Sequence, residues 1–321
     1  MTRLSDILAT RGRILTTEFL PPNSPDLSGL VRTALSIAPV VDCISIPEIK
    51  ANYNNVPRHR MNPFFVALKI RDLTGVETLF HLTPRDYNKN AVAGMLLAAA
   101  QSKLHNLLVI GGDRYSYDET ISIAKNVYDF SNSIEMIRGI RVFEDEFGLA
   151  PSEKFFVAAG TDPSILYSQN KTTVEKEMGR LVGRQDAGAD AIQTQPIFDL
   201  SCLEFVDLAR EHGIKIPFMI GLLPLQSEAD ANYIEKRFAI TIPSKSKAIR
   251  DRHDGESKAC ELAVELMRKG VTCLHIYPRE DPNFVLKVAH AIMGSKLADL
   301  NKQVILSNSV SFSHLDRGDS S

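Results

Sequence analysis

Short apolar runs recur eight times along this chain, and each lies next to a longer segment with the period of an α-helix. The apolar runs cover residues 14–19, 42–46, 77–82, 106–110, 155–159, 191–194, 218–221 and 272–276. The helical segments cover residues 26–39, 60–74, 88–103, 131–147, 173–188, 200–212, 227–239, 256–269 and 283–294. Runs that are apolar throughout, such as LLVI and FFVAA, are typical of parallel strands covered on both faces. Eight such units within about 280 residues predict an α/β fold, a single (β/α)8 or TIM barrel, because a doubly wound sheet usually has fewer strands.

The composition is that of an ordinary globular protein: 321 residues, 44% of them hydrophobic, with a mean hydropathy of −0.08. The 37 Lys and Arg nearly balance the 39 Asp and Glu without long runs of one sign, so we expect neither a nucleic acid nor a membrane as partner. We expect one barrel domain over residues 1–306 and a disordered tail over 307–321, which is rich in serine and lacks periodicity. The polar, basic segment 240–254 is interpreted either as a solvated loop or as a lid.

The cysteines and the N-terminus indicate a cytoplasmic protein. Cys43, Cys202, Cys260 and Cys273 lie far apart and form no CxxC pair, so we expect reduced, mostly buried thiols rather than a zinc or dithiol site. The first residues lack the apolar stretch of a secretory signal, and no segment of about 18 apolar residues is found that would span a bilayer.

One carboxylate stands at the end of the first apolar run. Active sites of (β/α)8 barrels lie at the C-terminal ends of the strands, and Glu18 occupies that position just before Pro21 and Pro22, which end strand pairing. Burial there would raise the pKa of the carboxyl, so that it could donate a proton near neutral pH. An ion pair with an Arg or Lys of a neighbouring strand explains the position equally well.

The fourth run ends in Gly111-Gly112-Asp113. The two glycines would let a ligand approach the backbone before a carboxylate is presented, although a simple turn accounts for glycine followed by aspartate just as well. The chain has no GxGxxG after the first run and no GxxxxGK[ST], so this is not a dinucleotide or P-loop fingerprint.

Two further polar strand ends are candidates for binding a heterocyclic ring. In the QTQ segment, strand alternation places Gln193 and Gln195 on one side and Thr194 on the other, where an amide would suit a ring edge or belong to a satisfied interior layer. His81 ends the third run and could be a base, a ring donor or a structural histidine. The scattered histidines include no HxH or HExxH, so no metal site is predicted.

Five segments occur in an order that resembles the methylenetetrahydrofolate reductase family. They are TTEFLPP, FHLTPRD, IGGD, EKEMGRLVGRQDAGADAIQTQ and IGLLPL, and the resemblance covers residues 12–294. It implies a (β/α)8 flavoprotein in which FAD passes hydride from NADH or NADPH to methylenetetrahydrofolate. By that resemblance the catalytic residues are Glu18, as the acid, and Asp113; the folate contacts are Gln195 and Asp113; and the cofactor contacts are His81, Gly112, Asp113 and Arg184.

The chain also departs from the family pattern at four places. Pro47-Glu48-Ile49-Lys50 replaces a TYGA-like segment, Gly111 replaces an arginine, Gly160 replaces a tyrosine, and Arg184 replaces a lysine. With these changes the electron donor is NADH, NADPH or a partner subunit. A homo-oligomer is compatible with each of these donors. The same changes also leave two alternative functions: a flavin-free or partner-reduced reductase of a related reduced pterin, and a non-catalytic barrel subunit that binds a pterin.

Overall fold

Eight parallel strands close into a barrel in the computed structural model, which describes residues 2–50, 52–53, 56–57, 59–168 and 171–293. The order around the barrel is β1-β10-β9-β8-β7-β6-β5-β2, and β1 pairs with both β2 and β10. The strands are β1 (Ile14–Glu18), β2 (Cys43–Ile46), β5 (Glu77–Leu82), β6 (Asn106–Val109), β7 (Phe156–Thr161), β8 (Ala191–Ile197), β9 (Phe218–Leu222) and β10 (Cys273–Ile276). All eight predicted strands are present, which confirms the (β/α)8 barrel.

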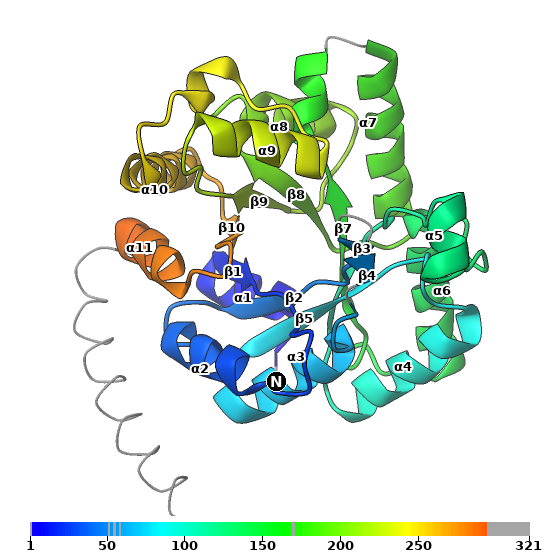
Figure 1. Cartoon of the computed structure of the whole chain (residues 1–321). Helices are drawn as coiled ribbons and strands as arrows, with labels where there is room; N and C mark the ends of the chain where they lie inside the picture. The colour runs from blue at the N-terminus through cyan, green and yellow to red at the C-terminus, as the bar shows by residue number, and fades with distance from the viewer. Residues whose placement is uncertain (1, 51, 54–55, 58, 169–170, 294–321) are drawn as a thin grey trace, which may run out of the picture.

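The helices lie outside the ring of strands (Figure 1). Those predicted from the sequence are α2 (Ser28–Ile37), α3 (Pro63–Thr74), α4 (Lys89–Gln101), α6 (Ser133–Glu146), α7 (Lys171–Asp186), α8 (Cys202–Glu211), α9 (Glu228–Phe238), α10 (Arg252–Arg268) and α11 (Pro282–Met293). Five of them begin after a residue whose side-chain oxygen accepts a hydrogen bond from a backbone N–H in the first turn; these caps are Asn62, Asn88, Asn132, Ser227 and Asp251. The caps of α3, α4, α6 and α9 lie within two residues of the predicted helix starts, whereas Asp251 starts α10 at Arg252, four residues before the predicted start at 256.

The sequence pattern missed several short elements. The helix α1 (Leu4–Arg11) precedes the barrel, α5 (Tyr117–Ser122) follows β6, and β3 (Asn52–Tyr53) pairs with β4 (Val56–Pro57) in a small hairpin. Two 3₁₀ turns, η1 (Pro163–Ser168) and η2 (Ser244–Lys247), complete the set. Each element is too short to show a hydrophobic period in the sequence.

The core has two layers. The larger cluster fills the space between the outer faces of the strands and the helices, whereas a smaller cluster occupies the inside of the barrel. Inside, the first inward residue of each strand is mostly apolar, and Leu4 and Ile7 of α1 pack against this end. The Leu4 N–H also donates to Asn106 Oδ1 over 2.9 Å. The N-terminal end of the barrel is therefore closed by α1, and its polar residues gather at the C-terminal end.

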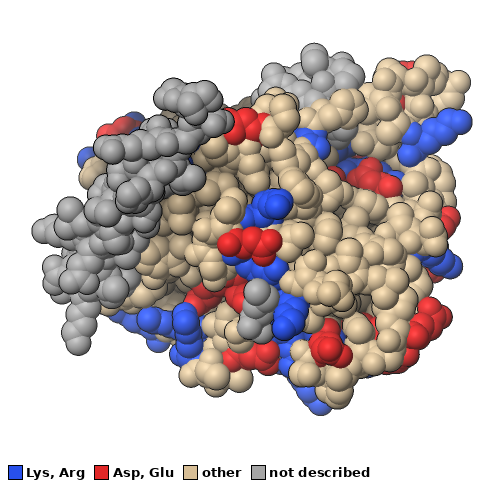
Figure 2. All heavy atoms as spheres, turned by 90° about the horizontal axis from the view of Figure 1, so that it is seen from below, with Lys and Arg blue, Asp and Glu red and all other residues tan. Residues whose placement is uncertain are grey.

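The basic segment 240–254 packs over the end of the barrel instead of forming a purely solvated loop. Ile240 and Ile242 are buried in a third apolar cluster with Leu223 and Leu225, and Lys247 forms an ion pair with Glu235 over 2.6 Å. On the face shown in Figure 2, basic and acidic side chains are intermixed.

The described chain forms one barrel, and the predicted tail 307–321 lies outside the described residues. None of the helices in the described part is long and apolar enough to cross a membrane.

Candidate active site

Polar side chains from five strands line the inside of the barrel near the C-terminal ends of the strands. Burial of polar groups is costly unless they are hydrogen-bonded or reserved for a ligand, so such a layer marks a site. Its members are Thr16 and Glu18 of β1, Ser45 of β2, His81 of β5, Gln193 of β8, and His275 of β10, with Tyr277 directly after β10. Three buried atoms in this layer have no hydrogen-bond partner among the described residues: His81 Nδ1, Gln193 Oε1 and His275 Nε2.

Glu18 is partly accessible to solvent, with 21% of its side chain exposed. Its Oε2 lies 3.6 Å from Nε2 of His275, which is fully buried beneath it. The other ring nitrogen of His275, Nδ1, lies 2.7 Å from Thr16 Oγ1. Among the described residues Glu18 therefore lies next to a histidine, and it does not form the ion pair with an Arg or Lys that the sequence also allowed.

His81 is held as a neutral imidazole. Its Nε2 lies 2.7 Å from Ser45 Oγ, and the ring is buried. Burial, with a smaller contribution from His275, lowers the pKa of His81 to about 3. A histidine with this pKa does not act as a base near neutral pH, but it can donate or accept a hydrogen bond from a ligand.

The two glutamines of the QTQ segment differ. The Gln193 amide is buried and its Nε2 donates to Tyr277 Oη over 3.3 Å, while the Tyr277 hydroxyl donates to the Thr194 carbonyl over 2.8 Å. An irregularity between Gln193 and Pro196 breaks the strand register, so simple alternation does not carry through to Gln195. Gln195 is half-buried, and its amide makes no hydrogen bond to a described residue. Its contact with a substrate stays a prediction.

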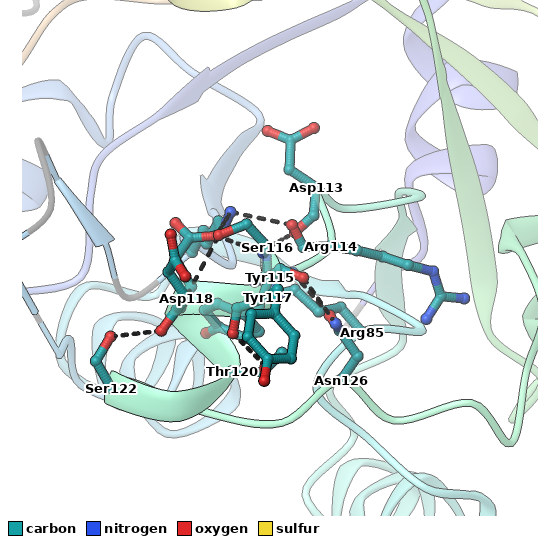
Figure 3. Close-up of polar contacts among 12 residues, drawn as sticks. Arg85, Asp113, Arg114, Tyr115, Ser116, Tyr117, Asp118, Thr120, Ser122 and Asn126 are labelled. Carbon is teal, nitrogen blue, oxygen red and sulfur yellow. Dashed lines mark hydrogen bonds and ion pairs between the residues drawn. The ribbon is translucent and has the colours of Figure 1, made fainter.

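The Gly111–Asp113 segment lies at the end of β6, against the turn that follows β5. Gly112 has φ +68°, and a Cβ at this position would lie 3.1 Å from Thr83 Cβ, so both conformation and space require glycine. Arg85, which is buried, donates from Nη1 to the Asp113 carbonyl over 3.1 Å and is also paired with Asp86. Figure 3 shows the Asp113 carboxylate pointing away from the polar contacts around Tyr115 and Arg85. The exposed carboxylate of Asp113 is thus free for a ligand.

Arg184 lies elsewhere. Its Nη1 donates to Glu177 Oε1 over 2.6 Å, and the same oxygen accepts from Thr161 Oγ1 over 2.9 Å. Because Glu177 and Arg184 belong to α7 and Thr161 to β7, this network joins the helix to the strand within the barrel wall. The structure does not bring Arg184 together with the residues inside the barrel, and its predicted cofactor contact stays a prediction.

A carboxyl with a raised pKa follows β2. Glu48 lies two residues beyond the strand, and its Oε2 accepts from Tyr87 Oη over 2.8 Å. Burial raises the pKa of Glu48 to about 7, although the Tyr87 hydrogen bond acts in the opposite direction. From the sequence Glu48 is placed at a strand end without a role. The raised pKa could not be predicted there, because the residues around Glu48 include Tyr87 from the turn after β5.

Sequence reasoning missed Thr16, Ser45 and His275, because they lie within apolar runs and were counted as strand interior. The signal that could have found them is the two-residue period of a strand: Thr16 and Glu18 share one face of β1, and Cys273, His275 and Tyr277 share one face around β10. Within the described residues, no three His, Cys, Asp or Glu side chains cluster so that they could hold a metal ion.

Solved structures resemble this chain in fold alone. A 2,3-dimethylmalate lyase of the PEP mutase/isocitrate lyase superfamily superposes with a TM-score of 0.52 at 12% identity, over 100% of both chains. An EDTA monooxygenase from Chelativorans sp. BNC1 superposes with a TM-score of 0.53 at 9% identity, over 88% of this chain and 94% of that one.

Curated relatives are similar in sequence. The chain is 24% identical over 230 residues to "Methylenetetrahydrofolate reductase (NADH) 1" of Arabidopsis thaliana, covering 66% of this chain and 37% of that protein. It is 27% identical to "Methylenetetrahydrofolate reductase 1" of Schizosaccharomyces pombe, covering 63% of this chain and 33% of that protein. It is 26% identical to "Probable methylenetetrahydrofolate reductase (NADPH)" of Caenorhabditis elegans, covering 66% of this chain and 32% of that protein. The aligned part of this chain thus spans about a third of the length of these relatives. The family model of methylenetetrahydrofolate reductase matches residues 3–292, and the chain therefore belongs to the methylenetetrahydrofolate reductase family.

Proposed function

We propose that this chain reduces 5,10-methylenetetrahydrofolate to 5-methyltetrahydrofolate, using FAD and a nicotinamide donor. The observation that carries the proposal is the Glu18 carboxyl, which stands at the C-terminal end of the barrel beside the buried, neutral side chains of His81 and Gln193 and the Tyr277 hydroxyl. Burial raises the pKa of Tyr277, so its hydroxyl stays protonated. The site thus offers one accessible acid and several neutral hydrogen-bonding groups.

The reaction needs an acid. The methylene group bridges two nitrogens of the folate, and one C–N bond must break to give an electrophilic iminium before hydride adds to the carbon. Glu18 donates a proton to the leaving nitrogen and becomes a carboxylate, which is reprotonated from solvent through its exposed part. The hydride then completes the methyl group, so that one proton and one hydride are consumed in each turnover.

Asp113 and Gln195 orient the pterin in this proposal. The Asp113 carboxylate has no side-chain partner among the described residues and accepts hydrogen bonds from the ring N–H groups, while the Gln195 amide both donates and accepts. Asp113 follows β6 and Gln195 lies within β8, and these two strands are separated in the barrel only by β7.

The residues inside the barrel fit the ring of a flavin. The unpartnered His81 Nδ1 and Gln193 Oε1 offer a mixture of donor and acceptor atoms, and Gly112 allows close approach to the backbone. FAD supplies hydride transfer between the donor and the folate when it is bound. His81, Gly112 and Asp113 are the residues of this chain that would hold the ring, whereas Arg184 would have to leave Glu177 to reach a phosphate.

A flavin-free reductase is the second candidate, and a specific observation favours it. Arg184 is held in an ion pair with Glu177, and glycines stand at positions 111 and 160 in place of an arginine and a tyrosine. One group expected to bind the cofactor phosphates is therefore engaged elsewhere, and two further groups expected to contact the cofactor are absent. In that case hydride would pass directly from the nicotinamide to the folate.

The electron donor, the oligomeric state and the cellular location are part of the same proposal. The relatives' names include both NADH and NADPH, so NADH, NADPH and a partner subunit are each to be tested as donor, and a homo-oligomer is compatible with each. The described cysteines are all free thiols, which supports a cytoplasmic location.

The first experiment is the visible spectrum of the purified chain, followed by anaerobic titration with FAD and then NADH or NADPH. Bands near about 450 nm that bleach with nicotinamide support the flavin relay. Bound flavin that does not bleach points to a partner subunit as donor. Absence of flavin binding, with folate reduced directly by NADH or NADPH, supports the second candidate. Absence of folate turnover under every condition contradicts both and leaves the non-catalytic pterin-binding subunit.

The second experiment replaces the acid. Glu18→Gln should lower folate reduction by at least about 100-fold, because an amide does not protonate the leaving nitrogen. Reduction of an artificial acceptor by NAD(P)H should stay within about twofold of the wild type, since it requires no such proton. Glu146→Gln, an exposed carboxyl of α6, is the matched control. Equal loss of both activities in Glu18→Gln would defeat the role of Glu18.

A further inference from the structure

His275 lies directly beneath Glu18, and Thr16 holds the far side of its ring. The Thr16 hydroxyl is 2.7 Å from His275 Nδ1, and His275 Nε2 is 3.6 Å from Glu18 Oε2. Thr16 and Glu18 lie on the same face of β1, and Thr16 is the register partner of His275 on β10. The three side chains therefore form a line from the barrel interior to the accessible carboxyl.

Thr16 and His275 are buried, and His275 does not form a hydrogen bond with Glu18. His275 is 0% exposed and Thr16 is 1% exposed, so neither exchanges hydrogen bonds with bulk water. His275 Nε2 makes no hydrogen bond to a described residue, and 3.6 Å to Glu18 is too long for one. A buried polar atom without a partner is costly, and catalytic hydrogen bonds are often long before the substrate binds. The Tyr277 ring packs edge-on against His275 at 4.6 Å between centroids and limits how far the imidazole can turn.

We propose that Thr16 and His275 are positioning residues that orient the Glu18 carboxyl for proton donation. This inference rests on the proposed function of Glu18 as the acid. His275 Nε2 points at one carboxyl oxygen, so that the other oxygen faces the substrate. The proton that leaves is the one on Glu18, and neither His275 nor Thr16 gains or loses a proton overall.

The Thr16 hydroxyl suits this task because it can donate to His275 Nδ1, which leaves the ring proton on Nε2. From Nε2 the imidazole donates to one oxygen of the Glu18 carboxyl, both before and after proton transfer. The acid proton is then carried by the other oxygen, which faces the substrate, and His275 keeps the same tautomer throughout.

Other titratable groups lie near Glu18 and His275, and their contributions to a pH profile must be distinguished from those of this pair. His81 of β5 acts on His275, and Tyr277 and Glu280, which follow β10, feel the charge of Glu18. Arg60 acts on Glu280. His81 and Tyr277 stay neutral around pH 7, because burial lowers the pKa of the first and raises that of the second. Burial also raises the pKa of Glu280, so Glu280→Gln serves to remove its contribution from a pH profile.

The matched variants are Thr16→Val and Thr17→Val. Both remove one buried hydroxyl from β1 with little change of shape, but Thr17 donates to the Ile276 carbonyl over 3.1 Å and does not contact His275. Thr16→Val should lower kcat for folate reduction about tenfold with KM within about twofold, and should shift the pH profile of kcat. Thr17→Val should keep kcat and the profile within about twofold, and Thr16→Ser should restore both. Equal losses in Thr16→Val and Thr17→Val would overturn the inference.

Histidine ¹⁵N NMR of the full chain provides a readout that does not need turnover. The chain has eight histidines, and the His275 signals are those lost in His275→Gln. Glu18→Gln should move the His275 Nε2 signal in the wild type and in Thr17→Val, but not in Thr16→Val, where the ring is no longer held. The positioning role would be contradicted if Glu18→Gln left the His275 Nε2 signal in place, or moved it equally in the wild type, Thr17→Val and Thr16→Val. If the chain lacks folate activity but shows the expected NMR response, the proposed function fails and the positioning of the Glu18 carboxyl stands.

Discussion

At the scale of single residues, the burial of Glu48 makes the free energy of unfolding depend on pH. Its pKa in the folded chain, about 7, lies above the ordinary value of 4.5, so the folded state keeps a proton that the unfolded state loses between these values. The free energy of unfolding therefore falls as pH rises from about 4.5 through about 7. Glu48→Gln stays neutral, and its side-chain oxygen can still accept from Tyr87.

The first prediction follows from that difference. At pH 8, Glu48→Gln should be more stable than the wild type by about 2 kcal/mol, whereas at pH 5 the two should unfold alike. Urea unfolding at both pH values measures this. A difference of the same size at pH 5 and pH 8 would show that Glu48 keeps an ordinary pKa.

The two glutamines of β8 make the second prediction. Gln195→Glu should raise the KM for folate by about tenfold with little change in stability, because Gln195 is half-buried and its amide makes no hydrogen bond to a described residue. Gln193→Leu should instead lower stability by about 1 kcal/mol, since it removes the buried amide that donates to the Tyr277 hydroxyl. Steady-state kinetics and thermal unfolding of both variants separate these roles. Unchanged folate kinetics in Gln195→Glu would remove Gln195 from the site.

At the scale of elements, the loop after β6 holds Asp113 at the edge of the barrel. Its shape depends on Gly112, which combines a left-handed conformation with close approach to Thr83, and on Arg85, which binds the Asp113 carbonyl. Lys50, beyond β2, adds a hydrogen bond to the Arg114 carbonyl over 3.0 Å. The position of the carboxylate is thus set by three separate strand ends.

Gly112→Ala and Gly111→Ala test this loop as a pair. Gly112→Ala should cost about 1–2 kcal/mol in stability and weaken binding of the folate, because the alanine is strained at φ +68° and meets Thr83. A Cβ at Gly111 meets nothing within 4 Å, so Gly111→Ala should change stability by less than about 0.5 kcal/mol. Equal effects of the two substitutions would show that the loop rearranges freely.

At the scale of the whole molecule, the barrel keeps stability and chemistry at opposite ends. Its N-terminal end is filled by apolar side chains and closed by Leu4 and Ile7 of α1, while its C-terminal end holds the buried polar layer. Such a division allows the polar end to keep unpartnered atoms for a ligand, because the other end provides the packing.

The last prediction uses this separation. Leu4→Ala should lower the free energy of unfolding by about 2–4 kcal/mol, because it opens a cavity at a fully buried position. The kcat of the surviving folded protein should stay within about twofold, since the change lies at the far end of the barrel from Glu18. Leu73→Ala, at a side chain 57% exposed, is the control and should be nearly neutral. Urea unfolding and initial rates measure both effects, and a loss of kcat in Leu4→Ala without unfolding would show that the two ends are coupled.

The sequence by itself determined the eight strands, the nine long helices beside them and the position of Glu18 at a strand end. Hydrophobic period and capping residues act within a few residues of each other, so they can be read along the chain. The sequence likewise showed the five motifs that place the chain in its family.

Only the tertiary structure decided which of these side chains meet. Thr16 and His275 are 259 residues apart in sequence and touch because β1 and β10 close the barrel. The register break in β8 separates Gln193 from Gln195, and the ion pair with Glu177 holds Arg184 in the barrel wall. Such contacts depend on closure, register and packing between distant segments, and no local pattern carries that information.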